Sequence, residues 1–325
     1  MHRKTFSRAL FWMVAATLMV CGQLASAQDY PSRPIRIVVP YPPGSITDVV
    51  ARLLANALSE RLKQSTIIEN RTGAGGIVAM KSVQQATPDG YTLGVIASGN
   101  IIQPWLMKEM PFDVRKDFMP LTMLYAAPFV MTVSPSFPPA DFQSFLAYVR
   151  ANPNKVFFGS SGVGTTTHLA AELMKQAFAL DLVHVPFRGS PEAYTAMLGG
   201  QVSIYFDVYG TARQHIESGR VRALAFTGRA RHPALPQVPA LAELSPGFNV
   251  FAWAGFAAPL GTPRDVVDKL ESALRASFKS PEVMRRLNEL GVEPGGSSSA
   301  EFLQFMNEEY EKWGKAIKAA GLKQE

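Results

Sequence analysis

Residues 159–168 contain serine, histidine and glycine close together, a combination that could carry out nucleophilic catalysis. The run Gly-Ser-Ser-Gly resembles the nucleophile elbow of serine hydrolases, in which two glycines flank the serine at fixed spacing. Val163 stands where the second glycine belongs if Ser161 is the nucleophile. The chain therefore lacks the complete nucleophile-elbow motif. An exported hydrolase that uses Ser161 or Ser160 with His168 remains an alternative interpretation of its function.

The other familiar catalytic and cofactor motifs are incomplete. Met80 replaces the glycine that a P-loop needs before Lys81, and Thr167 replaces the third glycine of a dinucleotide fingerprint in residues 162–167. The histidines after residue 27 lie at least 16 residues apart and lack the spacing of metal ligands. We expect no catalytic residue, no metal and no cofactor.

Three junctions built from small residues remain, at residues 43–48, 72–76 and 160–166. Each follows a strand-like run and opens a helix, whose first N–H groups have no partner within that helix. Small residues let a ligand approach this backbone closely, so the junctions predict sites for an anion.

The first junction also has a purely structural interpretation. Ser45 and Asp48 have the spacing of a capping box, which stabilises the start of a helix without any ligand. Glycines in such turns can also serve packing alone. We favour binding, because ligands of α/β folds collect beyond the carboxyl ends of the strands, where all three junctions would open.

Apolar runs of strand length alternate with segments of helical period along most of the chain. This order predicts an α/β fold with parallel sheets of the doubly wound kind. The expected strands are residues 35–41, 66–71, 91–98, 156–161, 181–187, 202–208 and 221–228, and the expected helices are residues 47–62, 77–86, 165–179, 190–200 and 211–219.

Two apolar, proline-rich stretches interrupt this alternation, at residues 118–139 and 246–263. They lack helical period, so we expect them to be extended. A chain that passes between two lobes needs two such crossings. We therefore predict one lobe from residues 28–128 and 252–325 and the other from residues 129–251.

The end of the chain predicts three helices, at residues 262–278, 280–291 and 298–321, each opened by proline or serine. In the last helix, an apolar stripe indicates a face that packs into the core. Its members are Phe302, Met306, Tyr310, Trp313 and Ile317.

Residues 1–27 have the layout of a secretory signal peptide, with cleavage expected after Ala27. Lipidation of Cys21, the only cysteine, is an alternative, although Val20 is bulkier than such a site accepts. The net charge is +6, but no lysine- or arginine-rich run follows this segment. We therefore expect no nucleic-acid partner.

Several motifs together are similar to those of the Bug family, the extracytoplasmic solute-binding receptors of tripartite tricarboxylate transporters. The similarity covers nearly all of residues 28–325. The motifs are PYPPGSITDVVAR, ENRTGAGG, PDGYTLG, FGSSGVGTTTHLAAEL, HVPFRGSPEAYTAMLGGQV, GRVRALAFTG, LPQVPALAE and APLGTP.

This resemblance implies a two-lobed α/β periplasmic binding protein of type II kind, each lobe a mixed sheet flanked by helices, hinged by two crossing segments. It implies a periplasmic monomer without enzymatic activity. The expected ligand is a small carboxylate (a di- or tricarboxylate, an acidic amino acid or an aromatic acid), delivered to the membrane subunits of a tripartite tricarboxylate transporter. A ligand sensor for a membrane signalling kinase is an alternative use of the same fold.

Carried over by position, the resemblance also implies which residues bind the ligand in the cleft. They are Pro43, Gly44, Ser45, Thr47, Asp48, Gly73, Ala74, Gly75, Gly76, Ser98, Asn100, Ser160, Ser161, Gly164, Thr165, Thr166, His168, Phe187, Arg188, Gly189 and Asp207.

Two positions depart from the family pattern. Ser45 replaces the second glycine of the usual Pro-Gly-Gly, so either a hydroxyl enters the pocket or the loop changes shape. Phe187 and Arg188 stand where many relatives have tyrosine and lysine. The planar guanidinium of Arg188 either grips a second carboxylate or is solvated at the edge of the lobe.

Overall fold

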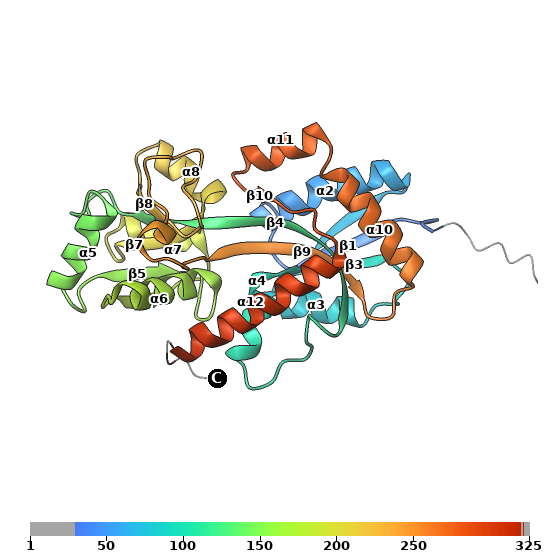
Figure 1. Ribbon diagram of the computed structural model, residues 1–325, viewed down its shortest axis with the longest axis horizontal. Helices are drawn as coiled ribbons and strands as arrows, with labels where there is room; N and C mark the ends of the chain where they lie inside the picture. Colours follow the sequence, from blue (N-terminus) through green and yellow to red (C-terminus); the bar gives the residue numbers. More distant parts are fainter. Residues whose placement is uncertain (1–29, 320, 322–325) are drawn as a thin grey trace, which may run out of the picture.

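The structure is a computed structural model that describes residues 30–319 and residue 321 (Figure 1). The predicted signal peptide, its cleavage site after Ala27 and Cys21 lie outside the described residues. Among the residues described, no helix combines the length and the apolar character needed to cross a membrane.

Three parallel strands form the sheet of the first lobe. β1 (Ile35–Val39) pairs with β2 (Thr66–Asn70) on one side and with β3 (Thr92–Ala97) on the other. The helices α2 (Ile46–Leu62) and α3 (Ile77–Gln84) connect these strands, as parallel neighbours require. The predicted alternation of strand and helix is confirmed here.

The second lobe repeats this arrangement. β5 (Phe157–Ser160) pairs in parallel with β6 (Val183–Pro186) and β7 (Ile204–Val208), and α6 (Thr166–Phe178) and α7 (Ser190–Leu198) connect them. The lobe also contains α5 (Phe142–Ala151), α8 (Tyr209–Glu217), β8 (Arg222–Phe226) and α9 (Leu241–Leu244).

Two long strands cross between the lobes, as the proline-rich stretches predicted (Figure 1). β4 (Phe118–Val133) pairs antiparallel with β9 (Phe251–Pro259) as far as Pro128, and from Phe129 onward it pairs with β7. The sheet is therefore mixed, in the order β2-β1-β3-β9-β4-β7-β5-β6. The division of the lobes at 128/129 and 251/252 stays a prediction, which this change of partner supports.

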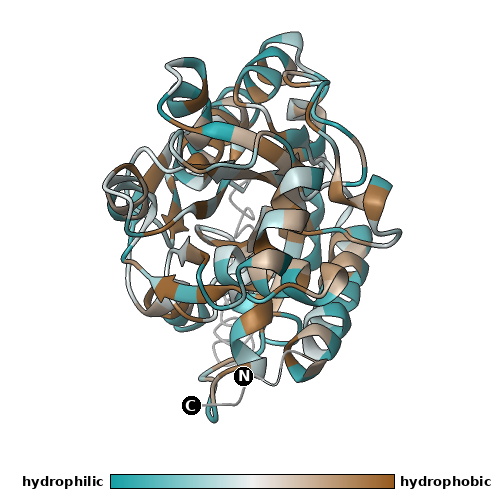
Figure 2. Cartoon of the chain, turned by 90° about the vertical axis from the view of Figure 1, so that its left-hand side faces the viewer, coloured by the Kyte–Doolittle hydropathy of each residue, from teal (hydrophilic) through white to brown (hydrophobic). Residues whose placement is uncertain are grey.

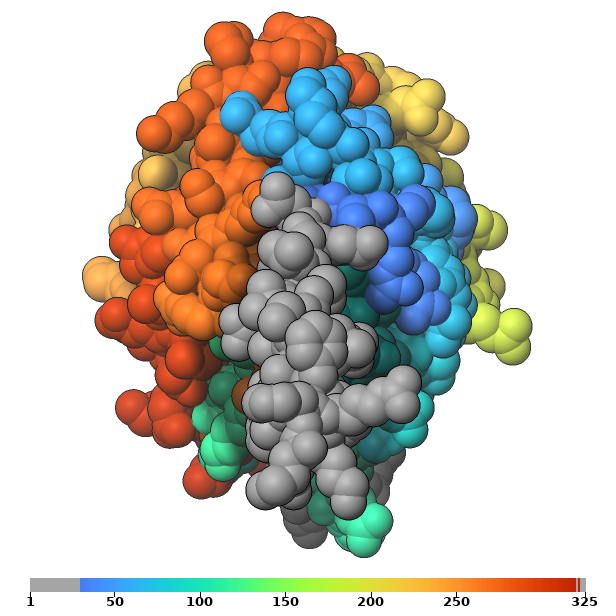
Figure 3. All heavy atoms as spheres, turned by 90° about the vertical axis from the view of Figure 1, so that its right-hand side faces the viewer, coloured from blue at the N-terminus to red at the C-terminus, as the bar shows by residue number. Residues whose placement is uncertain are grey.

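The end of the chain returns to the first lobe and forms the three helices predicted there. These are α10 (Arg264–Ser277), α11 (Pro281–Glu289) and α12 (Ser299–Ala319), with the short strand β10 (Glu293–Pro294) paired to β4. Figure 3 shows these segments (orange to red) beside the early ones (blue). Arg61 of α2 joins them by donating to the Ala276 carbonyl at 2.7 Å.

The apolar stripe of α12 packs into the core, as predicted. Phe302, Met306 and Trp313 are fully buried and Ile317 nearly so, whereas Tyr310 is partly buried. Glu309 of the same helix is also buried, and its Oε2 accepts hydrogen bonds from the indoles of Trp253 and Trp313 at 3.1 and 3.0 Å. Figure 2 shows hydrophobic residues (brown) on the interior strands.

Close packing of α12 on β9 leaves no room for a side chain at Gly255. A Cβ there would lie 2.1 Å from Cζ of Phe302. We expect Gly255→Ala to lower the free energy of unfolding by about 1–3 kcal/mol, because the ring must move within a filled core. Urea denaturation measures the effect. In a Phe302→Leu background the same alanine should cost clearly less, and an equal cost in both backgrounds would contradict this packing.

Candidate functional site

The loop that opens α2 is bonded largely to itself. The Ser45 hydroxyl accepts from the Asp48 amide, and the Asp48 carboxylate accepts from the Gly44 amide at 2.9 Å. Arg52 and Asn70 also donate to Asp48, at 2.9 and 2.8 Å. Burial alone would raise the pKa of Asp48, but these hydrogen bonds hold it below its usual value. Ser45 and Asp48 therefore act as helix caps, as the structural interpretation predicted.

Two other predicted residues of this loop differ in their surroundings. Thr47 is buried, and its hydroxyl hydrogen-bonds to the Tyr125 hydroxyl of β4 at 2.8 Å. Pro43 is exposed, immediately before Gly44, whose φ is +82°. The loop thus presents backbone and proline ring at its tip, while its polar side chains face inward.

The second loop has an unusual backbone. Gly73, Ala74, Gly75 and Gly76 have successive φ angles of +132°, +45°, +62° and +99°. Glycine tolerates these values and explains the composition of the loop. Gln103 Nε2 holds the strained turn by donating to the carbonyls of Ala74 and Gly75 at 3.3 and 3.0 Å. The loop forms a 3₁₀ turn, η1 (Ala74–Gly76), before α3.

Ser98 and Asn100 lie in a short helix, α4 (Ser98–Ile102), which the sequence analysis did not predict and which continues as the 3₁₀ turn η2 (Gln103–Trp105). Asn100 is buried: its Oδ1 accepts from the Ala97 amide at 3.0 Å, and its Nδ2 has no partner in the part of the chain that the structure describes. The Ser98 hydroxyl lies 3.1 Å from the Thr166 hydroxyl at the start of α6. This contact joins the two lobes.

The loop before α6 is also bonded internally. The Ser161 amide donates to the Thr167 hydroxyl at 2.9 Å, the Gly164 amide donates to Nδ1 of His168 at 3.1 Å, and the Thr165 hydroxyl caps the helix. Gly164 faces the first lobe, because a Cβ there would lie 2.5 Å from a methyl carbon of Leu106. The predicted loop therefore meets the first lobe through its glycine and through Thr166.

His168 packs within the second lobe. Its ring stacks on His184 with centroids 3.9 Å apart, and His184 stacks on Phe158. Burial, with a smaller effect of Lys175, lowers the pKa of His168 to about 4; burial and the neighbouring His168 do the same to His184. Ser160 Oγ lies 2.6 Å from Nε2 of His184. Both rings are therefore neutral at pH 7.

Two further loops complete the second-lobe side. Gly189 precedes α7, the Phe187 ring lies against Gly159, and the Arg188 amide donates to Glu192 at 2.9 Å. The Arg188 side chain is exposed and makes none of the ion pairs found in the described chain. Asp207, at the end of β7, is buried.

The expectation that helix-start amides are available to an anion holds only in part. Neighbouring side chains already accept from several of them, including those of Gly44, Ser161, Gly164 and Arg188. Other amides at the helix starts have no partner within the described part of the chain. They include the amides of Ile46 and Thr47, of Ala74 and Gly75, and of Thr166 and Thr167. One such pair lies at each of the three predicted junctions.

A second contact between the lobes lies immediately after α11, outside the predicted site. A Cβ on Gly210, at the start of α8, would lie 2.6 Å from the Leu290 carbonyl oxygen and 3.7 Å from a methyl of Ile46. His232 Nε2 lies 3.3 Å from the Gly291 carbonyl oxygen. Lobe contacts thus occur near the starts of both α2 and α4.

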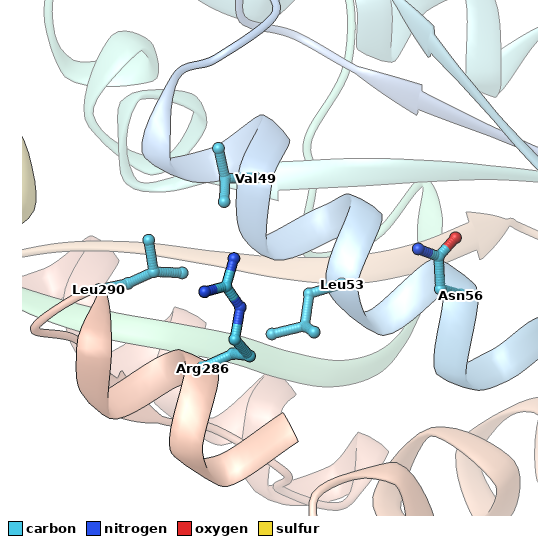
Figure 4. Close-up of a pocket in the computed structure, with 5 residues that line it drawn as sticks. All are labelled: Val49, Leu53, Asn56, Arg286 and Leu290. Atoms are coloured by element: carbon cyan, nitrogen blue, oxygen red, sulfur yellow. The ribbon is translucent and has the colours of Figure 1, made fainter. Parts of the chain in front are cut away.

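A cavity of about 270 Å³ lies between α2 and α11 (Figure 4). Val49, Leu53, Asn56, Arg286 and Leu290 line it. None of them belongs to the predicted ligand loops, so this cavity does not mark the site.

The sequence analysis did not predict the residues that hold the ligand loops in place through hydrogen bonds. Gln103 holds the second loop, and the Tyr205 hydroxyl bonds to those of Ser161 and Ser190 at 2.7 and 2.9 Å. The alternation in β7 was a usable signal, because Tyr205 and Asp207 share one face of the strand. No comparable pattern pointed to Gln103.

The comparison with protein families decides the class of the protein. Residues 50–322 match the family described as "Tripartite tricarboxylate transporter family receptor". The chain belongs to this receptor family. The predicted resemblance and the two-lobed fold are confirmed.

Individual relatives are similar to this chain in sequence or structure along nearly its whole length. Protein BugT of Bordetella pertussis is 31% identical over 301 residues, which cover 92% of each chain. The R. palustris protein Rpa4515, solved with adipate, has a TM-score of 0.84 at 32% identity, covering 91% of this chain and all of that one. MatC from Rhodopseudomonas palustris, with bound malate, has a TM-score of 0.77 at 32% identity, covering 89% and 100%.

Members of this family are periplasmic solute-binding receptors and not enzymes, so the hydrolase alternative is wrong. The geometry agrees for both proposed nucleophiles. Ser161 Oγ hydrogen-bonds to Tyr205 and Ser160 Oγ to His184, so neither pairs with His168 as that alternative requires.

The buried His168 makes the stability of the receptor depend on pH. An unfolded histidine binds a proton near pH 6.5, whereas folded His168 does so only near pH 4, so stability is lost as the pH falls between these values. His168→Gln keeps an acceptor for the Gly164 amide but cannot be protonated. Between pH 7 and pH 4.5 we expect wild type to lose about 2–3 kcal/mol more than this variant in urea denaturation. Equal losses would show that His168 is not buried as a neutral ring.

Proposed function

We propose that this receptor captures a small carboxylate between its lobes and delivers it to the membrane subunits of a tripartite tricarboxylate transporter. The observation that carries the proposal is the contact of Ser98 with Thr166, which brings the starts of α4 and α6 together across the lobes. Amides without partners lie close by in sequence at Thr166 and Thr167. The adipate and malate in the two solved neighbours support a carboxylate as the ligand class.

The predicted site residues serve this function in two ways. The exposed or backbone-presenting positions, such as Pro43, Gly75 and Arg188, are proposed to face the ligand. Buried positions such as Asp48 and His168 are proposed to hold the loops in place, because their polar atoms already bond within them. The two lobes are proposed to be residues 28–128 with 252–325, and residues 129–251.

The proposal includes the cellular setting. Cleavage after Ala27 would release a mature monomer into the periplasm, where the ligand and the membrane subunits meet. The signal-peptide layout of residues 1–27 and the periplasmic character of the family support this setting.

Thermal unfolding with a panel of carboxylates tests the proposed function. Malate, adipate, citrate, glutamate and benzoate represent the expected classes. A ligand at a hundred times its dissociation constant stabilises the folded protein by about 2.7 kcal/mol, so at least one should raise the melting temperature by several degrees. Protein refolded from denaturant serves as the control for ligand retained during purification. Refolded protein that responds to none of the panel would refute the proposal.

Thr166 should matter for binding more than for folding. Thr166→Val keeps the shape of the side chain but removes the hydroxyl that meets Ser98. We expect about a twofold to tenfold loss of affinity in calorimetry, because the neutral hydrogen bond that joins the lobes contributes about 0.5–1.5 kcal/mol. Thr87→Val, at an exposed position before β3, is the matched control and should bind as wild type does. Unchanged affinity in Thr166→Val would remove this residue from the site.

A further inference from the structure

Asp207 is a buried carboxyl with half of its hydrogen-bonding capacity unused. Only 5% of the residue is exposed. Its Oδ1 accepts from the Val208 amide at 2.9 Å, and its Oδ2 has no partner among the described residues. The hydroxyl of Tyr194, on α7, is also buried and has no partner within the same part of the chain. Such groups are rare in folded proteins and call for an explanation.

Among the described residues, none places a compensating positive charge beside Asp207. The titratable groups around it are Tyr205 on its own strand, Tyr194 from α7 and, stacked on the Tyr194 ring at 4.2 Å, His215 from α8. On β4, the residue paired with Asp207 is the apolar Val130. Asp207 takes part in none of the ion pairs of the described chain.

This environment favours the protonated carboxyl. An ionised group would bury a charged Oδ2 without a donor, which is costly, whereas a protonated Oδ2 is itself a donor. Burial raises the pKa of Asp207 to about 7. The Val208 amide and the nearby hydroxyls of Ser190 and Tyr194, which form no close hydrogen bond with the carboxyl, oppose only part of this shift. Both forms of the carboxyl therefore exist near neutral pH.

Asp207 is also connected to the ligand loops. Tyr205, on the same face of β7, bonds through its hydroxyl to Ser161 in the loop before α6 and to Ser190 at the start of α7. Three residues after Asp207, Gly210 packs against Leu290 and Ile46 of the first lobe. The loop before α6 and the start of α7 are thus joined to the strand that carries Asp207. A second negative charge held at these loops would disfavour the ionised form of this carboxyl.

We propose that Asp207 is a proton-binding site coupled to ligand capture, so that the receptor takes up one proton together with its carboxylate. This inference rests on the function proposed above. It assigns the buried carboxyl a role beyond that of a contact residue: it makes binding depend on pH.

The sign of the coupling follows from linkage. If the bound anion raises the proton affinity of Asp207, protons are taken up on binding wherever free Asp207 is ionised, which is above about pH 7. The dissociation constant then rises with pH, by up to tenfold per unit. Below about pH 6 free Asp207 is already protonated, and the affinity no longer changes through this group.

Isothermal titration calorimetry with malate and adipate tests the proposal. Each titration is run from pH 6 to pH 8.5 in two buffers of different ionisation enthalpy, which gives the number of protons exchanged. We expect wild type to take up between 0.5 and about one proton at pH 8, as a single coupled site requires. Asp207→Asn should take up none and should bind with an affinity that is nearly flat with pH.

Two further variants sharpen the result. Asp181→Asn removes an exposed carboxyl of the same lobe and should behave as wild type does. Tyr194→Phe removes a hydroxyl that lowers the pKa of Asp207, so it should move the pH profile upward even if Asp207→Asn fails to fold. Release of protons, or no exchange in wild type at pH 8, would overturn the proposal while leaving the carboxylate receptor intact. Absence of binding by either compound at any pH, with no response to the wider panel, would refute the proposed function and the coupling with it.

Discussion

The two crossing strands, β4 and β9, pair with each other up to Pro128, and a buried threonine joins them at the point where β4 changes partner. The relation between the lobes depends on this junction. Thr227 Oγ1 accepts from the Phe129 amide at 2.8 Å and donates to the Val250 carbonyl at 2.7 Å, while its own amide donates to the Phe129 carbonyl. Phe129 is where β4 changes partner, and Val250 immediately precedes β9. Pro128, which has no N–H to leave unpaired, stands at the change itself.

This junction helps to fix the position of the ligand loops of one lobe relative to those of the other. Each lobe carries parallel strands whose carboxyl ends lead into short loops, and the crossing strands hold those ends toward one another. In the first lobe, the backbone of the loop from Gly73 to Gly76 is strained, because even Ala74 has a positive φ. Gln103 offsets part of this strain by bonding to the carbonyls of the loop. A loop held in this way needs little rearrangement to receive a ligand.

Much of the fold could be predicted from the sequence because its strands and helices are long and periodic. The stripe of α12, the proline-rich crossings and the helices at the end of the chain all carry patterns of ten or more residues. α4 was missed because five residues after a strand cannot display helical periodicity. α5 was also missed, although Asp141 caps it and bonds to Ser144 as helix starts commonly do.

The site was harder to predict, since its chemistry depends on which side chains meet. The sequence indicated correctly which loops are rich in small residues. It could not show that the Gly44 and Gly164 amides would be taken by Asp48 and His168, because both bonds depend on side-chain conformation. The stacking of His168 on His184, from two different elements, is likewise a product of tertiary packing.

The amides that stay unpaired are numerous enough for a useful receptor. Six such groups at Ile46, Thr47, Ala74, Gly75, Thr166 and Thr167 would contribute roughly 9–18 kcal/mol if all bonded to a charged ligand. Part of this free energy is lost because the ligand gives up freedom of motion on binding, and micromolar affinity requires about 8 kcal/mol net. The amides that already donate to side chains hold the loops in place. Less of the binding free energy is therefore needed to order the loops. Because amides recognise any carboxylate alike, selectivity must come from the polar groups behind them. The chain from Ser161 through Tyr205 to Ser190 is one such group.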